Sequence, residues 1–322
     1  MVPAGGRISF ADIAKQTPLT EQMVTRLLRH AMMMRIFYKP KPGFVAHTKA
    51  SKIFINPVTN DWLITGTEEM WPASTKTVEA LEKWPGSEEP RLCIENNTTD
   101  SIYAFLGAHS ERAGRFANAM VSHLKKPEHD PKYITDYVDW ASLREAQVTH
   151  LGVGPGIFAM ALAKQHSNLK VVVQDMAFMM GLLKLEHPSK ELKGKVTFEP
   201  HDFFAPQTTS ADVFCFRWTY RNWAYKYSIL ALKAQLPVLK PGNRLIIQDN
   251  ILPEPGTGPA WREKAARSGD LSLATSFNSR DRTVADWKKL VQEADPSFVF
   301  MNFTLPKGSA LGILEFVWEG KA

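Results

Sequence analysis

Residues 148–175, VTHLGVGPGIFAMALAKQHSNLKVVVQD, have the order of a strand, a glycine turn, a helix and a second strand that ends in an acid. Gly152, Gly154 and Gly156 form a G-x-G-x-G turn, which lets the backbone bend sharply and lets a ligand approach the amides of the following helix. Asp175 ends the second strand, where a carboxylate can accept hydrogen bonds from a ribose diol. The segment predicts a nucleoside-binding unit. The alternative is a tight turn in a sheet that binds nothing.

The alternation of strands and helices continues toward the C-terminus. We expect strands at 196–198, 211–216 and 244–248, a helix at 226–239, and a closing antiparallel pair at 298–304 and 311–317. This order predicts an α/β fold with a doubly wound sheet, and polar residues follow the strand ends, where such sheets bind ligands.

The N-terminal half has a different pattern. Residues 8–37 have apolar residues at helical spacing, with a break at Pro18 and a predicted N-cap at Thr20. The β-type residues after them complete a helix-turn-helix and wing pattern, for which we favour packing over DNA binding because the second helix has few basic residues. Residues 61–120 have many large apolar side chains, most expected in the core and some in an aromatic or polyketide pocket.

Composition narrows the class of protein. The 322 residues have a net charge of +6 that is scattered along the chain, which does not favour nucleic-acid binding. Cys93 and Cys215 have no ligands at metal spacing, so we expect no metal and a reducing compartment. Without a leader-like N-terminus or a long apolar run, a cytoplasmic protein that does not contact membranes is predicted. The polar stretch 123–133 predicts a boundary between domains 1–133 and 134–322.

Several strings together resemble fungal O-methyltransferases of the class that includes plant phenolic O-methyltransferases. They include RLLRHAMMMRIF, ERAGRFANAM, the glycine turn, VVVQD, HDFFAPQ, RWTYRNW, LPVLKPGNRLIIQDNILPEPG and PKGSALGILEFVW, and the match spans essentially the whole chain. The resemblance implies a mainly helical, winged-helix-like dimerisation domain, a Rossmann-like domain that binds S-adenosylmethionine, and a homodimer. Family members have further helices ahead of ISFADIA, so we expect a reduced dimer interface or a trimmed chain.

The same resemblance implies site residues. The three glycines would face the methionine part of the cofactor, Asp175 the ribose, and Asp202 and Phe203 the adenine. The full cofactor set is Gly152, Gly154, Gly156, Asp175, Met176, Asp202, Phe203 and Arg217. The substrate set is Phe116, Met120, Thr219, Asn222 and Trp223. His150 stands where the family usually has an acid, so one contact to the cofactor amine is in doubt.

At Arg221 the sequence departs from the family pattern in a way that bears on function. In the family this place, in a motif like R-W-x-x-H-N-W, holds the histidine that deprotonates the substrate hydroxyl, and a guanidinium cannot act as that base. The two acids that orient the histidine fall on Asp249 and Asp281, so the catalytic set implied here is Arg221, Asp249 and Asp281, with the guanidinium held by both carboxylates as a fixed cation.

We predict the first of three functions and keep the other two as alternatives. The first is a pericyclase of fungal secondary metabolism, because O-methyltransferase-like pericyclases use an arginine here to act on polyketide-derived quinone methides. The second is methylation of a phenolic or polyketide hydroxyl with another base, for which His47, His109 and His123 are candidates by residue type. The third is an inactive ligand-binding homologue. In each case the expected partner is an aromatic or polyketide-like small molecule.

Overall fold

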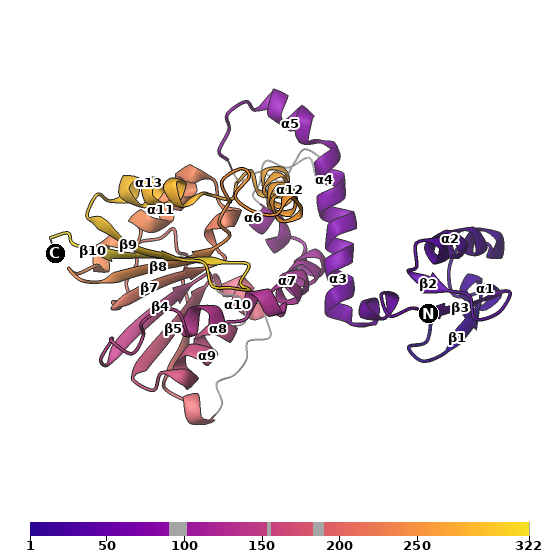
Figure 1. The fold of residues 1–322 in the computed structure, drawn as a ribbon, viewed down its shortest axis with the longest axis horizontal. Coiled ribbons are helices and arrows are strands. Elements are labelled where there is room, and N and C mark those ends of the chain that lie inside the picture. The colour runs from indigo at the N-terminus through magenta and orange to yellow at the C-terminus, as the bar shows by residue number, and fades with distance from the viewer. Residues whose placement is uncertain (90–101, 153–155, 183–189, 322) are drawn as a thin grey trace.

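A seven-stranded sheet forms the core of the C-terminal half of the computed structural model, which describes residues 1–89, 102–152, 156–182 and 190–321 (Figure 1). The strand order is β6-β5-β4-β7-β8-β10-β9. The strands are β4 (Ala146–Leu151), β5 (Leu169–Asp175), β6 (Val196–Pro200), β7 (Val213–Arg217), β8 (Arg244–Asp249), β9 (Phe298–Thr304) and β10 (Gly312–Trp318). The first five in this order run parallel, and β10 is antiparallel to both neighbours. The predicted doubly wound sheet with its closing antiparallel pair is confirmed.

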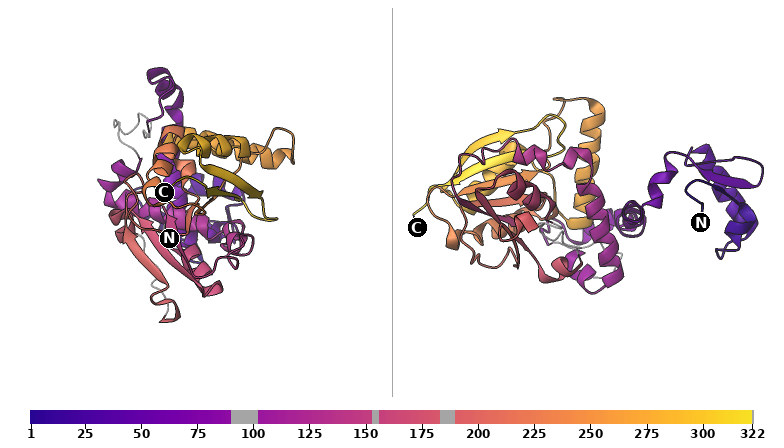
Figure 2. Two further views of the ribbon diagram at one scale, coloured as in Figure 1. Left: turned by 90° about the vertical axis from the view of Figure 1, so that its left-hand side faces the viewer. Right: turned by 90° about the horizontal axis from the view of Figure 1, so that it is seen from below.

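Helices cover both faces of the sheet, which is why most residues of the central strands are buried (Figure 2). The helices α11 (Tyr225–Lys233) and α13 (Val284–Ala294) contribute to the cluster on one face. The helices α8 (Lys132–Thr135) and α9 (Ile157–Gln165) contribute to the cluster on the other face. Shorter elements connect these layers: α10 (Ala177–Leu182), and the 3₁₀ turns η5 (Lys190–Leu192), η6 (Tyr220–Asn222) and η7 (Leu236–Val238).

The predicted helix at 226–239 is shorter than expected. It ends at Lys233, and the chain continues through the 3₁₀ turn η7, whose second residue is Pro237. Proline lacks an N–H and disfavours the α conformation in the residue before it, so the periodic apolar pattern extends past the end of the helix.

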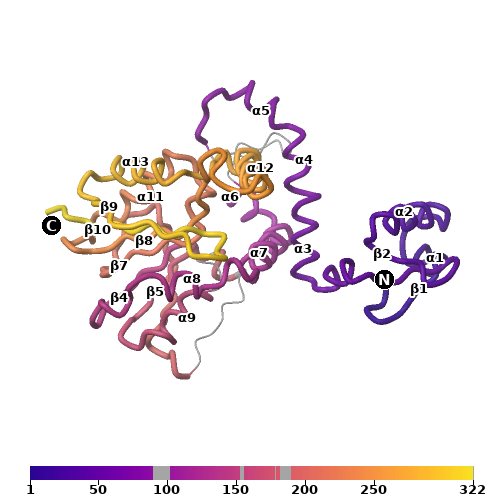
Figure 3. The backbone as a smooth tube through the Cα atoms, in the orientation of Figure 1, coloured from indigo at the N-terminus to yellow at the C-terminus, as the bar shows by residue number. Residues whose placement is uncertain are grey.

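A small N-terminal unit lies apart from the large sheet (Figure 3). It contains β1 (Arg7–Ser9), α1 (Phe10–Ala14), α2 (Glu21–Met33), β2 (Phe37–Tyr38) and β3 (Phe44–His47), with an antiparallel sheet in the order β1-β3-β2. The predicted cap of α2 is confirmed, because the Thr20 hydroxyl accepts the Met23 N–H at 3.3 Å. The N-terminal unit has a hydrophobic cluster of its own, which includes Phe10, Ile13 and Val45.

A run of helices connects this unit to the sheet. It consists of the 3₁₀ turn η1 (Ser51–Ile55), α3 (Pro57–Thr65), the π-helical turn η2 (Gly66–Met70), α4 (Trp71–Thr75), α5 (Thr77–Lys83), α6 (Ile102–Gly107), α7 (Ser110–Leu124) and the 3₁₀ turn η4 (Pro127–His129). Helix α3 packs on α7, and α4 packs on α12 (Ala260–Phe277). Helices α6, α7 and α12 share one hydrophobic cluster. Segments on both sides of the predicted boundary at residue 133 therefore pack together, and that boundary stays a prediction.

Membrane-spanning helices and clusters of metal ligands were searched for among the described residues only. None of the helices in the described ranges is both long and apolar enough to cross a bilayer. Over the same ranges, no three His, Cys, Asp or Glu side chains are grouped as metal ligands would be. Cys215 is a buried free thiol on β7, and Cys93 lies outside the described residues.

Candidate active site

The glycine turn follows β4 at the carboxyl edge of the sheet. Gly152 has φ +68° and Gly156 has φ +78°, conformations that favour glycine. A Cβ at Gly152 would lie 2.5 Å from Cγ2 of Thr219, and one at Gly156 would lie 3.1 Å from the Phe198 ring. Gly154 lies outside the described residues. Gly152 is therefore required both for its backbone conformation and for the close approach of the next strand end.

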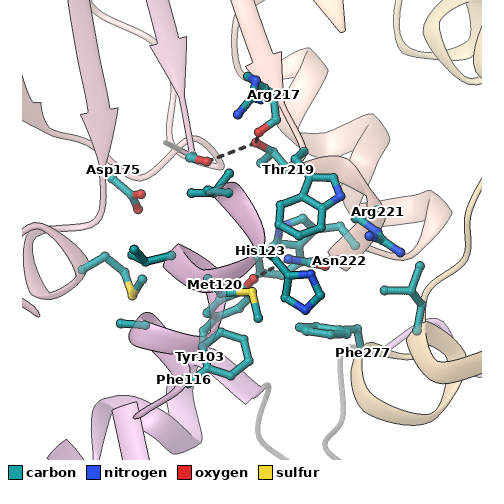
Figure 4. A pocket seen from close by; sticks show the side chains of 18 of the residues that line it. Tyr103, Phe116, Met120, His123, Asp175, Arg217, Thr219, Arg221, Asn222 and Phe277 are labelled. Carbon is teal, nitrogen blue, oxygen red and sulfur yellow. Dashed lines mark hydrogen bonds between the residues drawn. The ribbon is translucent and has the colours of Figure 1, made fainter. Parts of the chain in front are cut away.

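A cavity of about 370 Å³ opens above this edge (Figure 4). Asp175 at the end of β5 lines it, with its Oδ1 accepting the Met176 N–H at 2.7 Å. The predicted residues that line the cavity are Gly152, Asp175, Met176, Phe203, Arg217, Phe116, Met120, Thr219, Asn222, Trp223 and Arg221. The structure thus brings most of the predicted cofactor and substrate residues to one space.

Other predicted residues do not line this space. Asp202 is exposed, and its Oδ1 accepts the Phe204 N–H at 3.0 Å, so its carboxylate caps a turn. Gly156, Asp249 and Asp281 are also not among the residues that line the cavity. One carboxylate oxygen of Asp202 is engaged by its own loop, and the contact of this residue with adenine stays a prediction.

Several lining residues were outside the predicted cofactor and substrate sets, although His123 was a candidate base. Trp62, Met70, Tyr103, Trp218 and His123 lie on the walls, as do Leu273 and Phe277 of α12. Tyr103 contacts residues that are distant in the sequence. Its hydroxyl accepts a hydrogen bond from Nδ2–H of Asn222 at 2.9 Å. Its ring also stacks on Trp223 with centroids 5.4 Å apart. Abundant aromatic residues before 120 indicated a pocket, whereas nothing in the sequence of α12 distinguished its inner face from ordinary core.

Arg221, on η6, lines this largely apolar cavity, and its side chain lies beside that of Asn222 (Figure 4). Its Nη2 donates to Oδ2 of Asp281 at 3.4 Å, and its Cζ lies 5.3 Å from the Trp218 ring centroid. Asp249 does not hold the guanidinium by a hydrogen bond as expected: its Oδ2 accepts the backbone N–H of Arg221 at 3.2 Å. Asp281 thus orients the side chain, while Asp249 orients the backbone.

Burial sets the charge of the two acids. Asp249 is 1% exposed, and burial raises its pKa to about 6, against the opposing effect of the Arg221 cation. Burial likewise raises the pKa of Asp281, and Arg221 again opposes this. Both carboxylates therefore depend on the nearby cation to remain ionised near neutral pH.

The turn that carries Arg221 is fixed through its backbone. Nη1 of the fully buried Arg282 donates to the Tyr220 carbonyl at 3.1 Å, and its Nη2 donates to the Trp223 carbonyl at 2.8 Å. The Ser279 hydroxyl donates to the Arg221 carbonyl at 2.5 Å. These contacts clamp both ends of η6.

Comparison with known proteins places this site in a family. The family model described as the O-methyltransferase domain matches residues 114–296. The O-methyltransferase PaMT of Phomopsis amygdali is 38% identical over 99% of this chain and 75% of its own length. The chain belongs to the O-methyltransferase family. The Grayanic acid biosynthesis cluster O-methyltransferase of Cladonia grayi is 35% identical over 99% of this chain and 68% of its own length. The protein is accordingly an O-methyltransferase-fold enzyme of the fungal secondary-metabolite type.

A solved structure described as "A Pericyclic Reaction enzyme" shares the fold. Its TM-score is 0.78 at 17% identity, with 98% of this chain and 81% of that chain covered. At this identity the likeness concerns the fold alone.

The cofactor of this O-methyltransferase-fold enzyme is S-adenosylmethionine, and the described residues fit it. Gly152 and Asp175 line the cavity at two adjacent strand ends, and a side chain at Gly152 would collide with Thr219. When bound, S-adenosylmethionine supplies a methyl group activated by its sulfonium. For a methyl transfer, the residues of the chain would bind the acceptor, exclude water and stabilise charge on the acceptor oxygen.

The three histidines named as alternative bases have different positions. His47 contacts Ser51 and the Val2 carbonyl in the N-terminal unit, and Nδ1 of His109 contacts the Phe105 carbonyl at 2.8 Å. Only His123, of these three, lines the cavity, with its ring 5.6 Å from that of Trp218. Burial, followed by nearby cations, lowers the His123 pKa to about 4, so its imidazole is neutral at pH 7.

Proposed function

We propose that the protein methylates an acidic hydroxyl, a phenol or an enol, on an apolar aromatic or polyketide-like small molecule. The observation that supports this is the guanidinium of Arg221 in an apolar cavity that also reaches Asp175. The relatives named above are O-methyltransferases, which supports methyl transfer as the reaction.

The chemistry follows from charge. A cation within about 4–6 Å lowers the pKa of an acid by roughly 1–3 units, so a phenol of pKa about 10 becomes substantially ionised near pH 8. Arg221 then stabilises the oxyanion without accepting its proton. The neutral imidazole of His123 stands in the same cavity as a weak acceptor for that proton, which suits an acidic hydroxyl better than an aliphatic alcohol.

Residue roles are part of the same proposal. Asp175 and Met176 take the ribose, Phe203 the adenine, and the end of the cavity near Gly152 and Arg217 the amino-acid part. Acceptor-facing side chains are Phe116, Met120, Thr219, Asn222 and Trp223, with Tyr103, Trp218 and Phe277 added from the structure.

A pericyclase is the second candidate, and Arg221 favours it as well. Dehydration followed by a cycloaddition or Alder-ene reaction needs a cation at a carbonyl oxygen and a cavity that holds a folded conformer, and it needs no base at position 221. The resemblance of this one position to O-methyltransferase-like pericyclases carries the proposal.

Product mass separates the candidates. Purified protein is incubated with S-adenosylmethionine bearing a CD₃ group and either a series of phenols of decreasing pKa or a polyketide pyridone alcohol. A gain of the labelled methyl, faster for more acidic phenols, supports methyl transfer. An unlabelled dehydrated product or its isomer supports the pericyclase, and no turnover of either set leaves a ligand-binding homologue.

We also propose that the protein is a homodimer with domains 1–133 and 134–322. Leu27, Met33 and Met34 of the N-terminal unit are 54%, 82% and 64% exposed, which is an unusual apolar area for so small a unit.

A further inference from the structure

One end of the cavity gathers groups that favour a negative charge. His150 on β4 is paired with Cys215 on β7, and Arg217 lies two residues further along β7 at its carboxyl end. Both His150 and Arg217 line the cavity. Asp175 is the only acid among the described lining residues, and it stands at the end of β5, where the ribose is assigned.

His150 is buried, and neither of its ring nitrogens has a hydrogen-bond partner among the described residues. The residue is 2% exposed, and its ring packs edge-on against Phe158 with centroids 4.8 Å apart. An imidazole with two unsatisfied nitrogens is costly to bury, so the arrangement indicates that a bound ligand completes it.

Arg217 supplies the charge. Its Nε donates to Oε1 of Gln248 at 2.8 Å and its Nη2 to the His129 carbonyl, which fix the plane of the guanidinium. Nη1 is left as a donor with no partner among the described residues. Arginine keeps its charge even when buried, so the group presents a permanent cation to this end of the cavity.

Helix α9 adds a third favourable group. It begins at Ile157 with no side-chain cap, and both Ile157 and Phe158 line the cavity. Unsatisfied amides at a helix N-terminus attract anions. A cation, an imidazole donor and a helix N-terminus therefore surround one space.

We propose that His150 and Arg217 form a carboxylate subsite that binds the carboxylate of the amino-acid part of S-adenosylmethionine, and that the ammonium of the same ligand contributes little to affinity. This rests on the residue roles given under the proposed function. It assigns to His150 a neutral hydrogen-bond donor role, and it predicts an unusual preference among cofactor analogues.

Calorimetry on the full chain tests the preference with four ligands: S-adenosylhomocysteine, its analogue without the amine, its analogue without the carboxylate, and 5′-methylthioadenosine. Loss of the amine is expected to weaken binding by less than about threefold. Loss of the carboxylate is expected to weaken binding roughly 10- to 100-fold, the range for a hydrogen bond to a charged group.

His150→Phe keeps a ring of similar shape and removes the donor. It should weaken S-adenosylhomocysteine roughly tenfold and leave 5′-methylthioadenosine unchanged. His166→Phe is the matched control, because His166 is an imidazole at the other end of α9 and does not line the cavity.

The outcomes are distinguishable. If S-adenosylhomocysteine does not bind at all, the assignment of the cofactor roles fails. If it binds but the amine-free analogue is as weak as 5′-methylthioadenosine, or His150→Phe weakens both ligands equally, the carboxylate subsite is wrong. Displacement of S-adenosylhomocysteine by simple benzoate with undiminished 5′-methylthioadenosine binding would assign the subsite to a substrate carboxylate and overturn the proposal.

Discussion

Replacing Arg221 by methionine tests the cation directly. A unit charge about 4 Å from a developing oxyanion is worth about 4 kcal/mol at an effective dielectric constant of 20. Asp281 lies 3.4 Å from Nη2 and offsets part of this attraction. We therefore expect a loss of about 3 kcal/mol, or about 10²-fold in kcat, measured by product mass over time. Arg221→Lys should recover only part, because a point charge does not reproduce a planar fork.

Affinity for S-adenosylhomocysteine should be nearly unchanged in both variants, which separates lost chemistry from a damaged fold. Arg280→Met is the matched control, since Arg280 is an exposed arginine outside the cavity. Arg221→His rebuilds the family's base beside Asn222, and we expect it to extend methyl transfer to less acidic hydroxyls. Wild-type turnover that Arg221→Met leaves intact would refute the role of the cation for both candidate reactions.

Three further predictions follow from the structure. Gly152→Ala should weaken S-adenosylhomocysteine binding at least tenfold, because the new Cβ would meet Thr219 and the residue has a positive φ; unchanged calorimetry would contradict this. Asp249 has a raised pKa in the folded state, so its contribution to stability is present below its unfolded pKa of 3.8 and is lost as pH rises through about 6. The Tm of Asp249→Asn relative to wild type should therefore rise between pH 4 and pH 7, and parallel Tm curves would count against this. Leu27→Glu should convert the proposed dimer to a monomer by light scattering, whereas a monomeric wild type would remove the basis for the experiment.

The sequence was most informative where local rules act alone. The glycine turn and the apolar runs around Asp175 predicted the central strands because both faces of a doubly wound sheet are buried. The cap at Thr20 was predictable from one side chain and its neighbours.

Predictions that depended on long-range contacts were weaker. Asp202 was assigned to adenine from its place in the chain; it is exposed and is not among the residues that line the cavity, so its contact with adenine stays a prediction. Asp249 was expected to hold the Arg221 guanidinium, but it binds the backbone instead. The contribution of Phe277 on α12 depends on how that helix packs against α6 and α7, which no local pattern encodes.

The way η6 is fastened has a consequence for how such enzymes diversify. Arg282, Ser279 and Asp249 all bind main-chain atoms of residues 220–223, so none of these contacts depends on which side chain occupies position 221. One codon change can therefore replace the reactive side chain at position 221 while the backbone of the turn keeps its position. A histidine that accepts a proton and an arginine that provides a fixed cation can thus replace one another on the same fold in a single substitution, with no intermediate that fails to fold.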